Sequence, residues 1–383
     1  MNPAGAPLGV YIHWPYCARV CPYCDFNVVR APKDKQRREG EARKLADSIL
    51  ADLEAQTARL ADRRLVSLFF GGGTPSLMDP DDVGRLIAAA RRAWPAAEDL
   101  EVTLEANPGD ASPFAAFADA GVNRLSLGVQ SLNDDELRFL GRDHDAETAR
   151  RALEHATSAF RRVSADLIYA LPDQTTAAWA SALAEVAAFD LEHLSPYQLT
   201  IEPGTAFDRA VRRRAWATPE SDAAAELYET TQTVLQSLGF EAYEVSNHAR
   251  GPAGRSRHNL LYWRGEDYLG LGPGAHGRIT RRGARIATEA PRGIGAYIDR
   301  VRQTGSGAVE TSLQPREQAL ERLLMGLRTL EGVDLADLAP LQIPEGRISD
   351  LSGFVERRAG RLAATARGRP VLDRLVAELA DAA

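Results

Sequence analysis

The chain has 383 residues, of which 44% are hydrophobic and 26% charged, a composition typical of a globular protein long enough for two domains. Its formal net charge of −7 argues against broad nucleic-acid binding, because such binding needs clustered cations to neutralise phosphates. No apolar run is long enough to span a membrane and the first residues lack a signal-peptide pattern, so we expect a cytoplasmic protein.

Strand-like and helical segments alternate through the first half of the chain. Such regular alternation implies a parallel sheet with right-handed crossovers, either open or curled into a barrel, with functional groups at the carboxyl ends of the strands. The predicted strands are Leu8–His13, Leu65–Phe70, Glu101–Ala106, Arg124–Val129, Val163–Tyr169 and His193–Ile201. The predicted helices are Lys35–Leu60, Asp79–Ala93, Pro113–Ala120, Asn133–Leu140, Ala146–Phe160 and Thr175–Phe189.

The pattern changes near residue 245. A helix at Pro219–Leu238 and a strand at Ala242–Ser246 precede the stretch 247–277, which is rich in Gly, Arg, His and aromatic residues and has no clear period. We therefore predict two domains, 1–245 and 246–383, the second mainly α with a tail that resembles a winged helix. Its predicted elements are helices at Arg316–Thr329, Asp334–Leu338, Gly346–Glu356 and Arg367–Leu379 and a strand at Arg361–Thr365.

All three cysteines lie in one short loop after the first strand, at Cys17, Cys21 and Cys24. Thiolates are soft ligands that suit zinc or iron–sulfur clusters, and three cysteines do not make a disulfide framework. Structural zinc normally has four protein ligands, and His13 is a candidate for the fourth. In a [4Fe–4S] cluster, three thiolates leave one iron open for a substrate or cofactor. Three inert buried cysteines are the remaining alternative.

Other candidate site residues follow the later strands. Gly72, Gly73 and Thr74 belong to a glycine run that lets the backbone approach a ligand closely, although a tight turn explains it as well. No Lys-Ser/Thr follows, so this run is not a P-loop. Glu105 ends the third strand, where it could accept bonds from hydroxyl or ammonium groups or form a surface salt bridge. Gln130, Arg142 and Asp166 lie at or just beyond later strand ends.

The spacing C-x3-C-x2-C, with an aromatic residue before the third cysteine, resembles that of the radical S-adenosylmethionine (SAM) family. This resemblance implies a partial (β/α)6 barrel with a mainly α C-terminal accessory domain. It also implies a [4Fe–4S] cluster on Cys17, Cys21 and Cys24 and SAM on the open iron. By the same resemblance Tyr11, Tyr23, Gly72, Gly73, Thr74 and Glu105 contact SAM, and Gln130, Arg142 and Asp166 line a second nucleoside position or its surroundings.

Nearly the whole chain resembles the oxygen-independent coproporphyrinogen oxidase group, HemN and HemW. HemN-type oxidases carry a fourth cysteine two residues after the third, where this chain has Phe26. The stretch His258-Asn259-Leu-Leu-Tyr262-Trp263 matches the H-N-x-x-Y-W motif of HemW-like proteins. In this interpretation His258 is a haem ligand, Tyr262 and Trp263 pack on the porphyrin, and Arg257 and Arg264 pair with propionates. A structural, hydrogen-bonded His258 is the alternative, with His248 and His276 as weaker candidate ligands.

The resemblance thus implies a haem chaperone without coproporphyrinogen oxidase activity and with no catalytic residue assigned. Its expected cofactors are a [4Fe–4S] cluster, SAM and haem. Its expected partners are acceptor haem proteins, including membrane-associated respiratory enzymes, with no nucleic acid, and a homodimer is among the expected assemblies. The first alternative is an oxygen-independent coproporphyrinogen III oxidase. The second is a zinc-bearing structural protein on a vestigial barrel.

Overall fold

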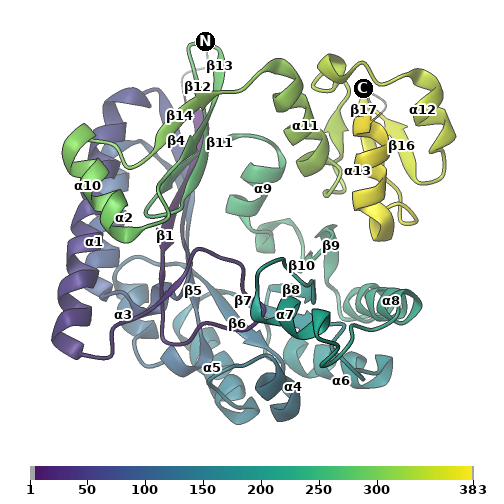
Figure 1. The fold of residues 1–383 in the computed structure, drawn as a ribbon, viewed down its shortest axis with the longest axis horizontal. Helices are drawn as coiled ribbons and strands as arrows, with labels where there is room; N and C mark the ends of the chain where they lie inside the picture. The colour runs from purple at the N-terminus through teal and green to yellow at the C-terminus, as the bar shows by residue number, and fades with distance from the viewer. Residues whose placement is uncertain (1–4, 382–383) are drawn as a thin grey trace.

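The protein is built around one twelve-stranded sheet, which the computed structural model describes within residues 5–381 (Figure 1). Six neighbouring strands run parallel, in the order of the sequence, and this confirms the predicted partial (β/α)6 barrel. They are β1 (Ala6–Trp14), β4 (Arg63–Gly72), β5 (Ala96–Ala106), β6 (Arg124–Gln130), β7 (Arg162–Tyr169) and β8 (His193–Gln198).

Crossover helices cover the outer face of these strands (Figure 1). Their starts follow local signals: side-chain oxygens of Asp34, Asp145 and Thr175 accept hydrogen bonds from backbone N–H groups in the first turn. No helix within residues 5–381 is both long and apolar enough to cross a membrane. The helices of this part of the chain are α1 (Lys35–Gln56), α2 (Pro80–Ala93), α3 (Phe114–Asp119), α4 (Asp134–Phe139), α5 (Ala146–Ala159), α6 (Thr176–Ala187), α7 (Ala206–Arg212) and α8 (Ser221–Ser237). Helix α7 is not a crossover helix and packs on the cysteine loop, where Phe207 N–H donates to the Pro22 carbonyl at 3.0 Å.

The two faces of the parallel strands differ in polarity. Because side chains alternate along a strand, Val102 and Leu104 of β5 join the core beneath the helices, whereas Glu101, Thr103 and Glu105 lie on the other face. The same alternation on β4, β6, β7 and β8 gives the concave face an unusually polar lining. That lining comprises Ser67, Glu101, Thr103, Glu105, Arg124, Ser126, Arg162, Ser164, Asp166, His193 and Ser195, most of them buried.

The sheet continues on both sides of the six parallel strands, and of these added segments the sequence pattern predicted only β9, as the strand Ala242–Ser246. Strand β11 pairs in parallel with β1, and only five residues with an internal glycine form it, too few for a period to stand out. The boundary at residue 245 stays a prediction, since strands before and after it pair within this sheet. The added strands are β9 (Glu241–Glu244), β10 (Asn247–Ala249), β11 (Asp267–Leu271), β12 (His276–Arg281), β13 (Ala284–Glu289) and β14 (Val309–Ser312).

From Pro315 the chain is mostly helical and has its own hydrophobic cluster, which includes Leu323, Leu362 and Leu375. The predicted helices at Asp334–Leu338 and at the end of Gly346–Glu356 are wrong, because these segments hold edge strands of a three-stranded sheet. The elements are α11 (Pro315–Gly326), β15 (Val333–Asp334), α12 (Glu345–Asp350), β16 (Val355–Arg358), β17 (Arg361–Ala364) and α13 (Leu372–Asp381).

Candidate functional site

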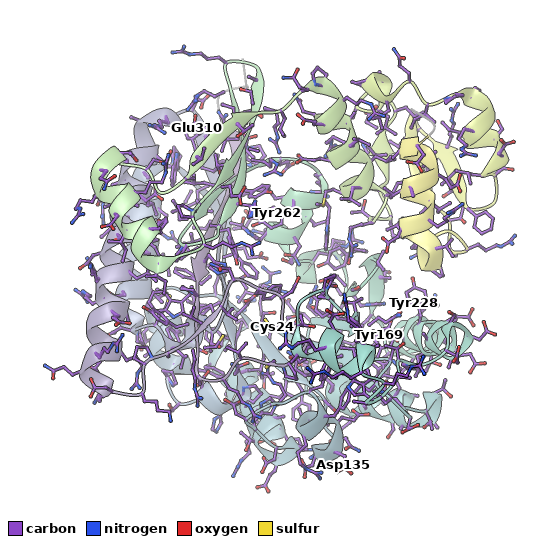
Figure 2. All side chains as sticks on the ribbon, viewed as in Figure 1. Cys24, Asp135, Tyr169, Tyr228, Tyr262 and Glu310 are labelled. Atoms are coloured by element: carbon purple, nitrogen blue, oxygen red, sulfur yellow. The ribbon has the colours of Figure 1, made fainter. Side chains whose placement is uncertain are left out.

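The cysteine loop lies at the carboxyl end of the parallel strands, and Figure 2 shows Cys24 near the middle of the molecule. Cys17 ends the two-residue strand β2 (Tyr16–Cys17), which pairs with β3 (Val29–Arg30). Cys17 is buried and all three cysteines are free thiols. Burial raises the pKa of the Cys17 thiol to about 11, a hydrogen bond with Thr74 opposes this, and the charges of Cys24 and Cys21 add to it. As thiolates, Cys21 and Cys24 would therefore each repel Cys17.

Arg142 brings a positive charge to this loop. Its Nη1 donates to Cys21 Sγ at 3.3 Å and to the Tyr23 hydroxyl at 3.4 Å. Its Nη2 donates to the Gly128 carbonyl at 3.1 Å and to the side chain of Asn107. Asn107 also donates to the Thr74 hydroxyl at 3.1 Å, so this residue, which was not among the predicted site residues, positions two of them.

The donor set of the loop fits an iron–sulfur cluster better than zinc. Within residues 5–381, no three His, Cys, Asp or Glu side chains converge as they would around a single ion. A four-iron cluster holds its thiolates farther apart than one ion does, and N–H bonds to sulfur, such as that from Arg142, tune it. His13 is not free as a fourth zinc ligand, because its Nδ1 meets the Tyr11 hydroxyl at 3.0 Å and its Nε2 meets the Asn27 carbonyl at 2.9 Å.

The glycine run packs directly on the chain that enters the cysteine loop. Gly73 N–H donates to the Trp14 carbonyl at 2.7 Å, and Thr74 N–H donates to the Tyr16 carbonyl at 2.9 Å. A Cβ at Gly73 would lie 2.7 Å from the backbone carbonyl oxygen of Tyr16. Gly72 has φ of +108°, and a Cβ there would lie 2.6 Å from the His13 ring. Both positions therefore exclude any other residue.

Two buried carboxyl groups lie below this edge of the sheet. Glu105 Oε2 accepts a hydrogen bond from Gly72 N–H at 3.1 Å, and Ser126 Oγ donates to Asp166 at 3.1 Å. Burial, with the charge of Asp166, raises the pKa of Glu105 to about 8, and burial raises the pKa of Asp166 to about 6. Glu105 is hence largely protonated at neutral pH, so its carboxyl can donate as well as accept a hydrogen bond.

Gln130 joins the group around Arg142. It ends β6 with φ of +65°, a left-handed conformation that is uncommon outside glycine. Its side chain folds back over Gly128, where a Cβ would lie 2.9 Å from Gln130 Nε2 and 3.5 Å from Arg142 Nη2. The structure thus brings together the predicted residues of the cysteine loop, the glycine run and the later strand ends.

His258 lies apart from the cysteine loop, on α9 (Arg257–Trp263), and is buried against β4. Its Nδ1 is 2.8 Å from the Ser67 hydroxyl, its Nε2 is 2.7 Å from the Tyr262 hydroxyl, and its ring stacks on Phe69. Burial lowers the pKa of His258 to about 3. A haem-ligand role for His258 stays a prediction, and it would require the ring to leave one of these partners.

The pH dependence of stability should report this environment of His258. The folded pKa of about 3 lies below the ordinary value of 6.5. At pH values between the two, the His258 imidazole is protonated in the unfolded chain and neutral in the folded chain. The free energy of unfolding should therefore fall as the pH drops below 6.5, by up to ~1.4 kcal/mol per pH unit from this group. Urea unfolding at pH 7.5 and pH 5.5 should show a smaller difference in His258→Gln than in the unchanged chain. An equal difference would contradict the assignment.

Comparisons with known proteins identify the family. The model of the radical SAM superfamily matches residues 11–186. The chain is 38% identical over 325 residues to the haem chaperone HemW of Escherichia coli, covering 82% of each chain. It is 35% identical to the HemW of Mycobacterium tuberculosis, over 98% of this chain and 95% of that one. The chain belongs to the HemW family of the radical SAM superfamily.

Two further comparisons, one with a mitochondrial relative and one with a solved structure, limit what the family assignment implies. The chain is 43% identical to the mouse mitochondrial "radical S-adenosyl methionine domain-containing protein 1", over 86% of this chain and 75% of that one. The solved structure of E. coli HemN, a coproporphyrinogen III oxidase, superimposes with a TM-score of 0.80 at 21% identity, covering 98% of this chain and 90% of that one. The HemN likeness establishes the fold of this HemW-family chain and not its activity.

Proposed function

We propose that this protein is a haem chaperone that binds haem, a [4Fe–4S] cluster and SAM and delivers haem to respiratory haem proteins. The observation that carries the proposal is the cysteine loop together with the family. The chain has three cysteines in total, and Phe26, with 60% of its surface exposed, stands where the resemblance to HemN calls for a fourth. Relatives that match over most of this chain are named haem chaperones.

The residues that would hold the cluster and SAM are those of the loop and the strand ends. Cys17, Cys21 and Cys24 would ligate three irons, and SAM would occupy the fourth. When bound, the cluster would supply an electron to the sulfonium of SAM or serve a structural or regulatory role. Arg142 would balance negative charge on the thiolates, and the protonated Glu105 would donate or accept at a ribose or ammonium group.

The two arginines that the family resemblance assigned to the haem propionates form ion pairs with carboxylates of the protein. Arg257 pairs with Asp99 at 2.6 Å, and Arg264 pairs with Glu331 at 2.5 Å. Tyr262 and Trp263, in contrast, line a large pocket beyond α9. Arg257 and Arg264 would therefore have to exchange these carboxylate partners before they could pair with haem propionates.

An anaerobic assay that offers coproporphyrinogen III and haem separately tests the proposal. With reconstituted protein and SAM, we expect stable haem uptake in the absorbance spectrum and no formation of protoporphyrinogen. Turnover of coproporphyrinogen III would establish the alternative, an oxygen-independent oxidase. A chain that takes up no haem and turns over nothing would also contradict the chaperone function.

Phe26→Cys tests how far the missing fourth cysteine separates the two activities. We expect this variant to assemble the same cluster and still not oxidise coproporphyrinogen III. The rest of its site would remain that of this chain and would not become that of the oxidase. Chromatography for protoporphyrinogen after anaerobic incubation is the measurement. Product formation by Phe26→Cys would show that one residue distinguishes chaperone from oxidase, contrary to our expectation.

A further inference from the structure

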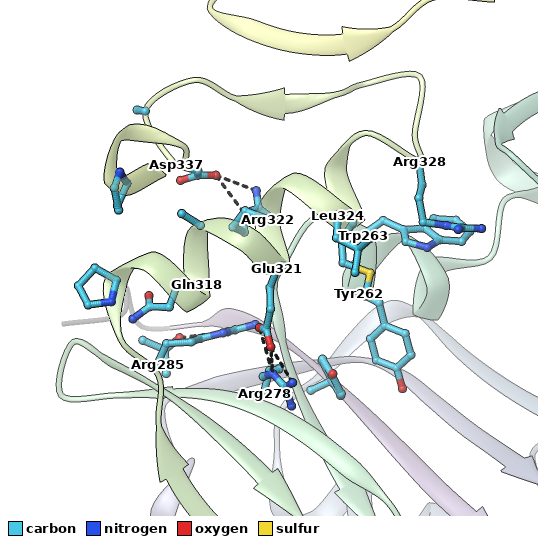
Figure 3. Close-up of a pocket in the computed structure, with 18 of the residues that line it drawn as sticks. Tyr262, Trp263, Arg278, Arg285, Gln318, Glu321, Arg322, Leu324, Arg328 and Asp337 are labelled. Carbon is cyan, nitrogen blue, oxygen red and sulfur yellow. Dashed lines mark hydrogen bonds and ion pairs between the residues drawn. The ribbon is translucent and has the colours of Figure 1, made fainter. Parts of the chain in front are cut away.

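A pocket of about 940 Å³ lies between the sheet and the C-terminal helical region, away from the cysteine loop (Figure 3). Its walls come from the end of α9, from β11 to β13, from α11 and from the 3-10 turn Ala339–Leu341. The two largest hydrophobic clusters of the described residues lie on either side of it, since α11 belongs to the C-terminal cluster and the strands to the cluster of the main sheet. The volume is near the upper end of the ~300–1,000 Å³ of small-molecule sites.

One side of the pocket is aromatic and apolar. Tyr262, Trp263 and Tyr268 line it, and the rings of Tyr262 and Tyr268 have centroids 4.1 Å apart. Leu324 and Met325 face them from α11, and Leu324 keeps 42% of its surface exposed. Half-buried aromatic side chains and an exposed leucine around one cavity suit a flat apolar ligand, which would cover them.

The other side carries four arginines and two carboxylates. Arg278 makes a bidentate pair with Glu321, and Arg322 donates twice to Asp337 at 2.9 and 3.0 Å (Figure 3). The Nη1 of Arg322 is buried and has no hydrogen-bond partner. Arg285 and Arg328 complete the set of cations, so the lining has more positive than negative side chains.

The two carboxylate partners are poorly shielded from water. The side chains of Glu321 and Asp337 are 34% and 41% exposed. Ion pairs this open contribute only about 0–1 kcal/mol, so exchanging them for ligand carboxylates costs little. Glu321 and Asp337 can then turn to solvent, while Arg278 stays anchored by the bond from its Nη1 to the Gly277 carbonyl at 2.9 Å and the Nη1 of Arg322 is open to an incoming carboxylate.

We propose that this pocket is the haem site of the protein, and the inference rests on the proposed function. The porphyrin would lie against Tyr262, Trp263 and Met325, and its propionates would replace Glu321 and Asp337 on Arg278 and Arg322. His258 is then a positioning residue behind the pocket, because its Nε2 holds the Tyr262 hydroxyl at 2.7 Å. This site uses α11, which no pattern in the sequence connects with the motif on α9.

Haem titration of the full chain, followed by absorbance, tests the site with two variants and a matched control. Arg278→Ala removes a propionate partner, and Ala336→Trp adds bulk at an exposed residue of the lining. Arg281→Ala is the control, since Arg281 lies on the same strand and makes an exposed ion pair with Glu310 outside the pocket. We expect haem affinity to fall about tenfold in each pocket variant and to stay unchanged in Arg281→Ala.

The possible outcomes test the location of the haem site separately from the proposed chaperone function. Haem uptake by the unchanged chain, with equal affinity in Arg278→Ala and Ala336→Trp, would overturn this site and leave the chaperone function standing. No uptake by the unchanged chain would overturn the proposed function itself. Haem dimethyl ester, which lacks free carboxylates, should lose less affinity than haem when Arg278 is replaced, and an equal loss would contradict the propionate contact. Thermal melting of each variant checks that the affinity change is not a loss of folding.

Discussion

Replacing Cys17, Cys21 and Cys24 together by alanine should abolish cluster assembly, reducing the iron content from about four atoms per chain to near zero. The three thiols lie beside one another and beside Arg142, and the chain has no further cysteine that could take over. The measurement is iron and sulfide analysis after anaerobic reconstitution, together with the absorbance near 400 nm. Retention of nearly four irons would refute the assignment of these ligands.

Cys17 needs a control, because it is buried and its loss could disturb the fold. The variant Cys21→Ala with Cys24→Ala changes only partly exposed positions and should lose the cluster equally, since one thiolate cannot hold it. Thermal unfolding of the cluster-free proteins should give nearly the same midpoint for this double variant and the unchanged chain. A large drop in that midpoint would mean that the missing iron reflects misfolding and not lost ligands.

Glu101→Gln should lower the free energy of unfolding by about 3–5 kcal/mol, which is a large part of the stability of a globular protein. Glu101 is 1% exposed, and its carboxylate accepts from Arg162 at 2.8 Å and from the backbone N–H of Arg257 and of His258 at 3.1 Å. Glutamine keeps the shape and removes the charge. Arg124 and Arg162, both on the polar inner face, would then lack their central counter-charge.

Urea unfolding at neutral pH measures the effect of Glu101→Gln, and Glu310→Gln is the matched control. Glu310 also pairs with two arginines, Arg59 and Arg281, but its side chain is 29% exposed. Solvent weakens such pairs, so the control should lose no more than about 1 kcal/mol. Equal losses in the two variants would mean that the buried carboxylate contributes no more than a surface one.

Glu101 also connects the barrel to α9. Its bonds to the backbone of Arg257 and His258 fix the start of the helix whose last residues line the proposed haem pocket. A loosened α9 should therefore weaken haem binding as well as stability. This contact joins β5 to a segment 156 residues further along the chain, and no local pattern in the sequence indicates it.

Much of the parallel sheet and the cysteine loop was predictable from the sequence. Strand and helix periods, caps such as Asp34 and the C-x3-C-x2-C spacing depend on residues close together in the chain, so their physics is local. Strands β11 to β14 were missed because each is short and is stabilised by a partner strand. For β11 that partner is β1, which lies near the start of the chain and far from β11 in the sequence.

By itself, the sequence determined the alternating βα framework, the three thiols in one loop and a glycine run that fits either a close chain approach or a tight turn. The tertiary structure alone decided which polar residues meet. It placed Asn107 between Thr74 and Arg142, occupied both ring nitrogens of His258, and paired Arg257 with Asp99 and Arg264 with Glu331. The reason is physical: a hydrogen bond or an ion pair depends on distances in space, and those follow from how separate strands and helices pack.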